Sequence, residues 1–185
     1  MGDLWLVRHG RTEWSVAGRH TSWTDLPLLP EGEEDARALV PRLAGRSFEQ
    51  VLTSPRLRAR RTAELAGFPD AEVDPDLAEW DYGDYEGVTT DEIREQAPGW
   101  TIWSRPAPGG ETADQVAERC DRVVARALAV DGDTLVFGHG HGLRVLAARW
   151  LRLPASEGRL LRLDNGTISV LGHEHGAPVV LTWNS

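Results

Sequence analysis

The stretch that decides the fold is Leu4–Thr12, with the sequence LWLVRHGRT, in a chain of 185 residues. Its apolar half predicts a buried strand, which ends where Gly10 lets the chain turn away from the sheet. Arg8 carries planar donors that suit phosphate or carboxylate, and His9 can act as a nucleophile or proton carrier near neutral pH. Open α/β sheets bind ligands at the carboxyl ends of their strands. The stretch alone therefore fits an anion site with a reactive imidazole, and equally a strand end with solvated polar residues.

Strands and helices alternate along the rest of the chain. We expect residues 11–30 to form a loop without a helix, followed by a helix that begins at Pro30 and carries its apolar stripe to Leu43. Residues 51–53 predict a strand, after which Ser54 caps a helix that starts at Pro55 and ends near residue 65. Further elements are expected as helices at 90–96, 111–130 and 143–151, a loop with a short strand at 74–87, a buried strand at 134–137, and two or three strands within 160–183. This alternation predicts one α/β domain over residues 1–185, with a mostly parallel sheet and an antiparallel edge.

The composition excludes several classes of partner and of chemistry. A net charge of −9 argues against nucleic acid and anionic membranes as partners. All 20 basic residues are arginine, which excludes lysine Schiff-base and P-loop mechanisms. The one cysteine, Cys120, cannot form an internal disulfide and is consistent with a reducing compartment. Because no secretion signal or apolar run of membrane-spanning length is apparent, we expect a cytoplasmic protein.

Two of the buried strands end in histidines that lie next to glycines. His9 follows the first strand and His139 follows the strand at 134–137. In a parallel sheet both carboxyl ends lie on one edge, so we expect the two imidazoles to be neighbours. Arg58, early in its helix, can reach the same edge, and Gly140 opens a helix whose free N–H groups favour an anion. These residues predict a phosphate cradle, although each of them singly also fits a core or surface position.

Several short blocks of the sequence, in their order and spacing, resemble the histidine phosphatase superfamily in its phosphoglycerate mutase-like branch. The blocks are Leu6–Trp14, Gly18–Thr21, Thr24–Leu28, Ser54–Ala59, Leu77–Glu79, Tyr82–Gly87, Gly109–Thr112 and Gly138–Gly140. Within the family, Glu13–Ser15 and Ala78–Gly83 are most similar to small broad-specificity acid phosphatases and sugar-bisphosphatase-like members. The resemblance implies a three-layer α/β/α sandwich and a metal-independent phosphomonoesterase without a cofactor, whose partner is a small phosphorylated substrate such as a sugar phosphate.

The resemblance also implies a role for each residue of the cradle. His9 would attack the phosphoryl group and become transiently phosphorylated, while Arg8, Arg58 and His139 bind the phosphoryl oxygens. Glu79 would protonate the leaving oxygen and then deprotonate the attacking water. This division of work agrees with phosphoryl transfer, which needs positioning and charge stabilisation more than covalent chemistry from the protein.

Further contacts with the substrate or its phosphate are expected from Ser15, Thr21, Tyr82 and Gly140. Tyr82 and Trp80, the neighbours of Glu79, would also desolvate its carboxyl group and favour the protonated acid. Since attack requires a neutral His9 and departure of the leaving group requires a protonated Glu79, we expect an acidic to neutral optimum.

Departures from the family pattern separate a hydrolase from a mutase. Ser15 stands where many members have Asn, and Ser22 replaces a common Gly. Thr90 occupies the position of a Lys in the mutase branch, and Arg105 is one of two expected arginines. Hydrolysis is therefore favoured over a phosphomutase. The mutase, a non-catalytic module that binds a phosphorylated ligand, and a metal-dependent hydrolase remain alternatives, and the chain can be a monomer or a homodimer.

Other conspicuous residues give weaker signals. His141 beside His139 is a poor metal pair without a carboxylate or thiolate partner. Cys120 lies on an apolar helix face, which predicts a core position. The segment His173–His175 predicts an exposed turn. The tryptophans Trp14, Trp23 and Trp103 fit pocket walls and core positions about equally.

Overall fold

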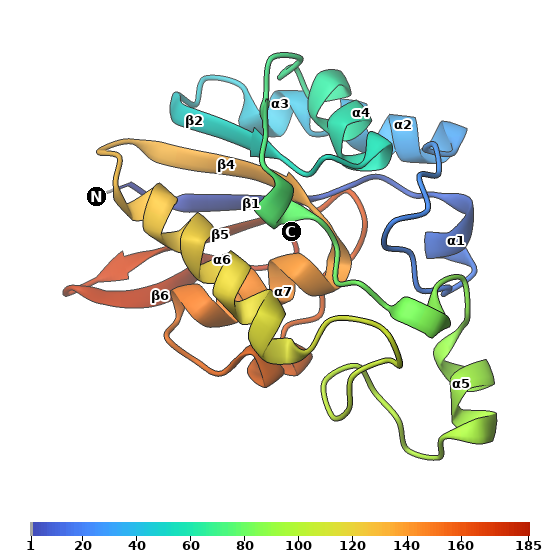
Figure 1. The fold of residues 1–185 in the computed structure, drawn as a ribbon. Coiled ribbons are helices and arrows are strands. Elements are labelled where there is room, and N and C mark those ends of the chain that lie inside the picture. Colours follow the sequence, from blue (N-terminus) through green and yellow to red (C-terminus); the bar gives the residue numbers. More distant parts are fainter. Residues whose placement is uncertain (1) are drawn as a thin grey trace.

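A mixed sheet of six strands forms the middle of the molecule in the computed structural model, which describes residues 2–185 (Figure 1). The strands are β1 (Leu4–Arg8), β2 (Phe48–Thr53), β3 (Glu72–Val73), β4 (Asp133–Gly138), β5 (Ile168–Glu174) and β6 (Ala177–Thr182), in the order β3-β2-β4-β1-β5-β6. The first four strands in this order pair in parallel, whereas β5 runs antiparallel to both β1 and β6. The predicted parallel sheet with an antiparallel edge is confirmed.

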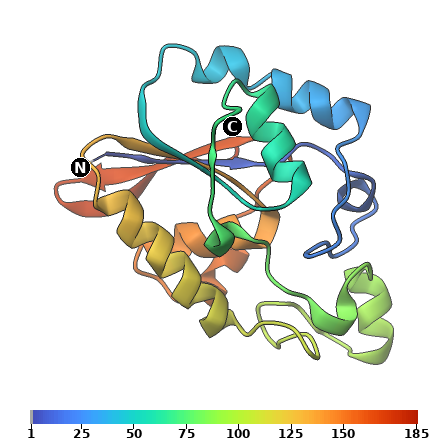
Figure 2. The same ribbon diagram turned by 45° about the horizontal axis from the view of Figure 1, so that its top comes forward.

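Helices cover both faces of this sheet. On one face lie α2 (Pro30–Arg37), α3 (Val40–Leu43) and α4 (Leu57–Leu65), and on the other lie α6 (Ala113–Leu128) and α7 (Gly140–Trp150), as Figure 1 and Figure 2 show. A further helix, α5 (Thr90–Gln96), lies beyond the carboxyl edge of the parallel strands, away from both layers. The three-layer sandwich is therefore confirmed. No helix within residues 2–185 has the length and apolar character needed to cross a bilayer.

The apolar run of β1 supplies both cores of the molecule. Leu4 and Leu6 pack into the core shared with α6 and α7, whereas Trp5 and Val7 pack into the core shared with α3 and α4. Successive side chains of a strand point to opposite faces, so a strand covered on both sides needs a continuous apolar sequence. This is the physical reason why the opening stretch reveals the architecture.

Several element boundaries differ from the expected ones. Residues 11–30 were expected to lack a helix but contain the short α1 (Glu13–Val16), which Thr12 and Ser15 stabilise through a capping box. The helix expected from Pro30 to Leu43 is divided into α2 and α3. Pro41 explains the break, because it lacks an N–H and its ring would clash with the carbonyl group four residues earlier.

The start of α4 also differs, since the helix begins at Leu57 with Arg56 as its N-cap rather than at Pro55. The hydroxyl of Ser54, expected to cap this helix, pairs instead with the ring of His139. The short strand β3 precedes the loop in which it was expected, and that loop contains the 3-10 turns η1 (Pro75–Leu77) and η2 (Gly83–Tyr85).

The C-terminal part of the chain contains the 3-10 segment η3 (Ala155–Leu160) and then the hairpin of β5 and β6. His173 belongs to β5, and only His175 lies in the exposed turn expected for both.

Close backbone packing fixes the chain directly after β1. A Cβ atom on Gly10 would lie 2.1 Å from the carbonyl oxygen of Gly32 in α2, so only glycine fits there. The N–H of Gly10 also donates to Oγ1 of Thr62 in α4, at 3.1 Å. These contacts hold the preceding residue, His9, at the carboxyl edge of the sheet.

Candidate active site

The two histidines that follow the parallel strands β1 and β4 meet at the edge of the sheet. Arg8 pairs in register with Gly138, and the N–H of His9 donates to the carbonyl oxygen of Gly138 at 3.0 Å. The ring centroids of His9 and His139 are 5.2 Å apart. The expectation that these imidazoles are neighbours is confirmed, because adjacent parallel strands end side by side.

His9 is a buried imidazole with one nitrogen free. Its Nδ1 lies 2.7 Å from the carbonyl oxygen of Gly10, which can only accept, so Nδ1 carries the proton and Nε2 keeps its lone pair. Burial, reinforced by the positive charges of Arg58 and Arg8, holds the pKa of His9 well below its usual range. The ring is therefore neutral, with an unprotonated nitrogen, as a nucleophile must be.

The guanidinium groups of Arg8 and Arg58 both act on this imidazole through their charge, and each is held by backbone carbonyl groups. Nη1 of Arg8 donates to the carbonyl oxygen of Leu163 at 2.5 Å, and Arg58 donates to the carbonyl oxygens of Thr24, Thr21 and Ser22 at 3.0–3.1 Å. In both arginines Nε is buried and makes no hydrogen bond with the described residues. These two N–H groups are donors that an anion beside His9 would satisfy.

His139, the N-cap residue of α7, supplies the second imidazole beside His9. Its Nε2 lies 2.6 Å from Oγ of Ser54, whereas its Nδ1 is buried without a partner among the described residues. Burial and the charge of Arg58 hold the pKa of His139 well below its usual range.

Glu79 binds the N-terminal end of α7 with its carboxylate. Oε1 accepts from the backbone N–H groups of Trp80 and Gly142 at 2.8 and 2.7 Å, and Oε2 accepts from that of His141 at 3.0 Å. Two of the helix N–H groups that were expected to favour a phosphate, those of His141 and Gly142, are therefore engaged by Glu79. Because Oε2 accepts one bond and Oε1 two, Oε2 is the oxygen with more capacity to hold and pass a proton.

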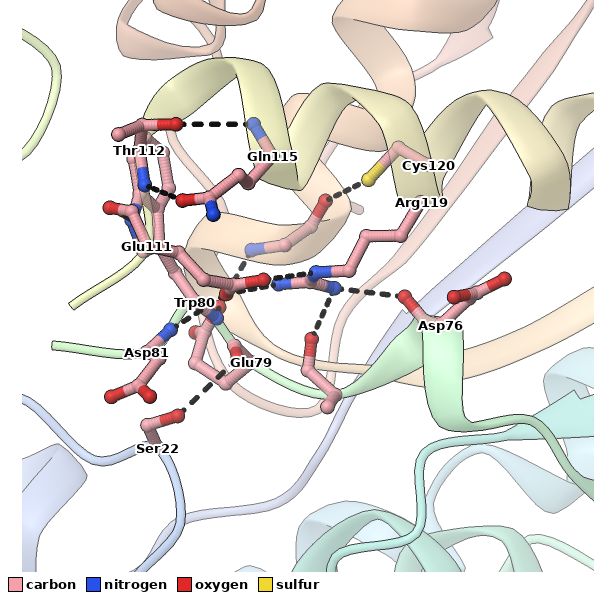
Figure 3. A network of polar contacts seen from close by, with 12 residues as sticks. Ser22, Asp76, Glu79, Trp80, Asp81, Glu111, Thr112, Gln115, Arg119 and Cys120 are labelled. Atoms are coloured by element: carbon pink, nitrogen blue, oxygen red, sulfur yellow. Dashed lines mark hydrogen bonds and ion pairs between the residues drawn. The ribbon is translucent and has the colours of Figure 1, made fainter.

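Arg119 of α6 holds the segment that carries Glu79, as Figure 3 shows. Its guanidinium donates to the carbonyl oxygens of Asp76 and Ala78 at 2.8 and 2.7 Å, and to the carboxylate of Glu111 at 2.9 and 3.0 Å. Glu111 in turn accepts from the N–H of Asp81 at 2.9 Å. The network thus fixes the chain on both sides of Glu79.

A cavity of about 190 Å³ opens over this edge of the sheet. Its lining includes Arg8, His9 and Glu79 together with the four further expected contact residues, Ser15, Thr21, Tyr82 and Gly140. Arg58 and His139 do not line it, but the ring of His139 lies beside that of His9 and the charge of Arg58 lowers the pKa of His9. The structure therefore brings the nine expected site residues together, seven in the lining of the cavity and two near His9.

The additional expected contacts include two hydroxyl groups that donate to the backbone and one glycine. The hydroxyl of Ser15 donates to the carbonyl oxygen of Thr12 at 3.0 Å, and that of Thr21 donates to the carbonyl oxygen of Arg19 at 3.1 Å. Gly140 leaves room for Arg8, since a Cβ atom there would lie 3.3 Å from Cζ of the arginine. The roles of these residues toward a substrate stay predictions.

The cavity lining also includes residues that the sequence did not indicate as contacts, among them His141 and Arg144 of α7. Nδ1 of His141 pairs with the hydroxyl of Tyr82 at 2.6 Å, and burial, reinforced by Arg144, holds the pKa of His141 well below its usual range. Arg144 lies one turn beyond Gly140 on α7, with its Cζ 4.6 Å from the centroid of the Trp103 ring. Its i+4 spacing from Gly140, on the same helix face, was the signal available in the sequence.

Arg144 is held by the backbone in a way that leaves one nitrogen free. Nε donates to the carbonyl oxygen of Gly158 at 2.9 Å and Nη2 to that of Arg159 at 3.1 Å, and Nη1 makes no hydrogen bond with the described residues. No carboxylate of residues 2–185 forms an ion pair with it. The lining of the cavity therefore includes a positive charge without an ion-pair partner among the described residues.

The remaining conspicuous residues lie outside the chemistry of the cavity. Cys120 is 3% exposed in the core, as expected, and burial raises the pKa of its thiol to about 12. Of the tryptophans proposed as pocket walls, Trp103 packs against Arg144 and His141, whereas Trp23 is 55% exposed. Within residues 2–185, no three His, Cys, Asp or Glu side chains are grouped as metal ligands would be.

Comparison with known proteins gives consistent matches over nearly the whole chain. Residues 4–185 match the model of the histidine phosphatase superfamily (branch 1). An acid phosphatase of Mycobacterium tuberculosis is 42% identical over 177 residues, which cover 94% of this chain and 87% of that protein. Sedoheptulose 1,7-bisphosphatase of Saccharomyces cerevisiae is 39% identical over 181 residues, covering 80% of this chain and 67% of that protein. The solved structure of a Mycobacterium tuberculosis open reading frame product, 40% identical, superposes with a TM-score of 0.95 and covers 99% of this chain and 97% of its own.

Proposed function

The chain belongs to the histidine phosphatase superfamily, and from this premise we propose that it hydrolyses small phosphomonoesters, such as sugar phosphates, through a phosphohistidine at His9. The observation that carries the proposal is the state of His9. Its imidazole is neutral, its Nε2 is free, and it lines a cavity within the electrostatic reach of the guanidinium groups of Arg8 and Arg58. A phosphoryl group placed there would meet the nucleophile and the charges that stabilise its oxygens.

Hydrolysis proceeds in two halves at this site. In the first, Nε2 of His9 attacks phosphorus while the bond to the leaving oxygen breaks, and Glu79 gives its proton to that oxygen. Arg8, Arg58 and Nδ1–H of His139 bind the equatorial oxygens. In the second, Glu79 takes a proton from water, whose oxygen attacks phosphorus as the bond to His9 breaks. In the net reaction, the phosphomonoester and water are converted to an alcohol and inorganic phosphate.

The proposed reaction needs no metal ion. Phosphoryl transfer requires neutralisation of the equatorial oxygens, and two guanidinium groups with an N–H donor supply it here. A cytoplasmic location and the choice between monomer and homodimer stay predictions of the sequence.

A phosphomutase is the alternative within the same family. Its preference for phosphoglycerate would require the Lys and paired arginines that the resemblance implies for that branch. Thr90 lines the cavity where the Lys would stand, and the side chain of Arg105 donates to the carbonyl oxygen of Pro98 at 3.1 Å. These features favour release of phosphate to water over its retention on the product.

The test is phosphate release from p-nitrophenyl phosphate in excess chelator, at acidic and neutral pH, by the wild type and by His9→Ala. We expect turnover by the wild type and none by His9→Ala. His175→Asn, which removes a histidine from an exposed turn, is the matched control and should keep full activity. Retention of phosphate on a product would support the mutase, and binding of inorganic phosphate without turnover would support the non-catalytic module. Loss of activity on chelation would contradict metal independence.

A further inference from the structure

Ser54 lies at the point where β2 ends beside β4, fully buried next to His139. Its N–H donates to the carbonyl oxygen of Phe137 at 2.9 Å, which extends the pairing of the two strands by one residue. Its Oγ lies 2.6 Å from Nε2 of His139, and its exposed fraction is 0%. The contact is thus set by the sheet itself and excludes solvent.

The neighbours of this hydroxyl determine which way its proton points. The backbone N–H of Arg56 donates to Oγ of Ser54 at 3.3 Å, so one lone pair of the hydroxyl is engaged. The acceptor that remains within reach of the hydroxyl proton is Nε2 of His139. Nε2 then accepts, and the ring proton of the neutral imidazole must lie on Nδ1.

The opposite arrangement would leave two buried groups unsatisfied. If Nε2 of His139 donated to Ser54, the hydroxyl proton would have no acceptor among the described residues. Nδ1 would also be a buried lone pair without a donor, and it could not donate to a phosphoryl group bound at His9. A buried polar group without a partner is destabilising, so this arrangement is disfavoured.

We propose that Ser54 is a positioning residue that holds His139 as the Nδ1–H tautomer, so that this N–H donates to the phosphoryl group at His9. The proposal rests on the proposed phosphatase function for the identity of the acceptor. Nδ1 of His139 is buried without a protein partner, as are Nε of Arg8 and Nε of Arg58. The ring of His139 lies beside that of His9, with centroids 5.2 Å apart, and Ser54 makes its Nδ1 a donor.

The first test reads the tautomer directly and does not depend on turnover. Nitrogen NMR of protein labelled with ¹⁵N-histidine distinguishes a protonated ring nitrogen from an unprotonated one. In the wild type, we expect a protonated-type signal for Nδ1 of His139 and an unprotonated-type signal for Nε2. In Ser54→Ala, we expect this pattern to be lost, through averaging or reversal. Thr53→Val removes the neighbouring buried hydroxyl, which does not contact His139, and should leave the pattern unchanged.

The second test separates positioning from stability. Ser54→Ala should lower kcat for p-nitrophenyl phosphate on the order of 10-fold, in the range seen when groups that orient catalytic ligands are removed. Ser54→Cys, which keeps the volume and a weaker donor, should recover part of this loss, and it replaces the alanine variant if that variant does not fold. Thr53→Val should keep the wild-type kcat.

The results also separate this proposal from the function on which it rests. An Nε2–H signal in the wild type, or an unchanged tautomer and kcat in Ser54→Ala, would overturn the role of Ser54. A wild type that shows the Nδ1–H tautomer but hydrolyses no phosphomonoester would overturn the phosphatase function and confirm the tautomer alone.

Discussion

Replacing Arg119 by methionine removes the side chain that ties the Glu79 segment to α6. The guanidinium, with only 9% of the side chain exposed, donates to two backbone carbonyl groups of that segment and forms two bonds with Glu111. Methionine is of similar length and apolar, so the change removes the donors while filling much of the space. The segment then loses its attachment on both sides of the proposed acid.

The expected loss of stability follows from these bonds. Two partly buried carbonyl groups lose their donors, at about 1 kcal/mol each. Glu111, 25% exposed, loses its ion pair but regains some solvation. Removing one member of a fully buried pair costs about 3–5 kcal/mol, so for this partly exposed network we expect a loss of about 3 kcal/mol, which for a chain of this size corresponds to a fall in melting temperature of about 10 °C. A displacement of Glu79 by about 1 Å would in addition lower kcat on the order of 100-fold.

The assay combines thermal unfolding with kcat for p-nitrophenyl phosphate. The matched control is Arg122→Met, on the same helix, whose exposed guanidinium also pairs with Asp76. An exposed pair contributes little, so this control should unfold and turn over like the wild type. If Arg119→Met has the same melting temperature and kcat as Arg122→Met, the argument that Arg119 positions Glu79 is refuted.

Three other consequences are open to measurement. Burial lowers the pKa of His9, His139 and His141 in the folded protein. Below the pKa of an unperturbed histidine, about 6.5, the unfolded chain therefore binds more protons than the folded protein does. The free energy of unfolding is therefore highest above that pH and falls as the pH drops through it. We expect a loss of about 4 kcal/mol between pH 7.5 and 5.5, which urea unfolding at the two pH values would measure. A flat dependence would show that these rings protonate without unfolding. Arg144→Met should raise KM about 10-fold for a substrate with a second anionic group, such as fructose 1,6-bisphosphate, and should change KM for p-nitrophenyl phosphate much less. An equal change in KM for both substrates would mean that the free Nη1 does not contact the leaving group. Gly10→Ala should lower the melting temperature strongly, since the added Cβ would overlap a backbone carbonyl group. A melting temperature equal to that of the wild type would show that α2 shifts freely to make room for the Cβ atom.

The nucleophile and its surroundings could be predicted from the sequence for a physical reason. A strand covered on both faces requires an unbroken apolar run, and β1 and β4 are each followed directly by a histidine next to glycine. Parallel neighbours end on one edge, so the proximity of His9 and His139 follows from local sequence together with topology. The element boundaries that failed, such as the break between α2 and α3, depend on where proline interrupts a helix and on which partner a side chain finds.

The tertiary structure decided everything that depends on partners distant in the sequence. Ser54 fits a helix cap by local pattern, but the pairing of β2 with β4 places it against His139, 85 residues away. Glu79 meets α7 and Arg119 meets the Glu79 segment only through packing, and Arg144 faces the cavity because α7 lies against the sheet there. Local sequence determines which groups are available and where strands end, whereas the three-dimensional arrangement determines the hydrogen-bond partners. The reason is that a buried polar group must pair with a group that the fold brings within hydrogen-bond distance.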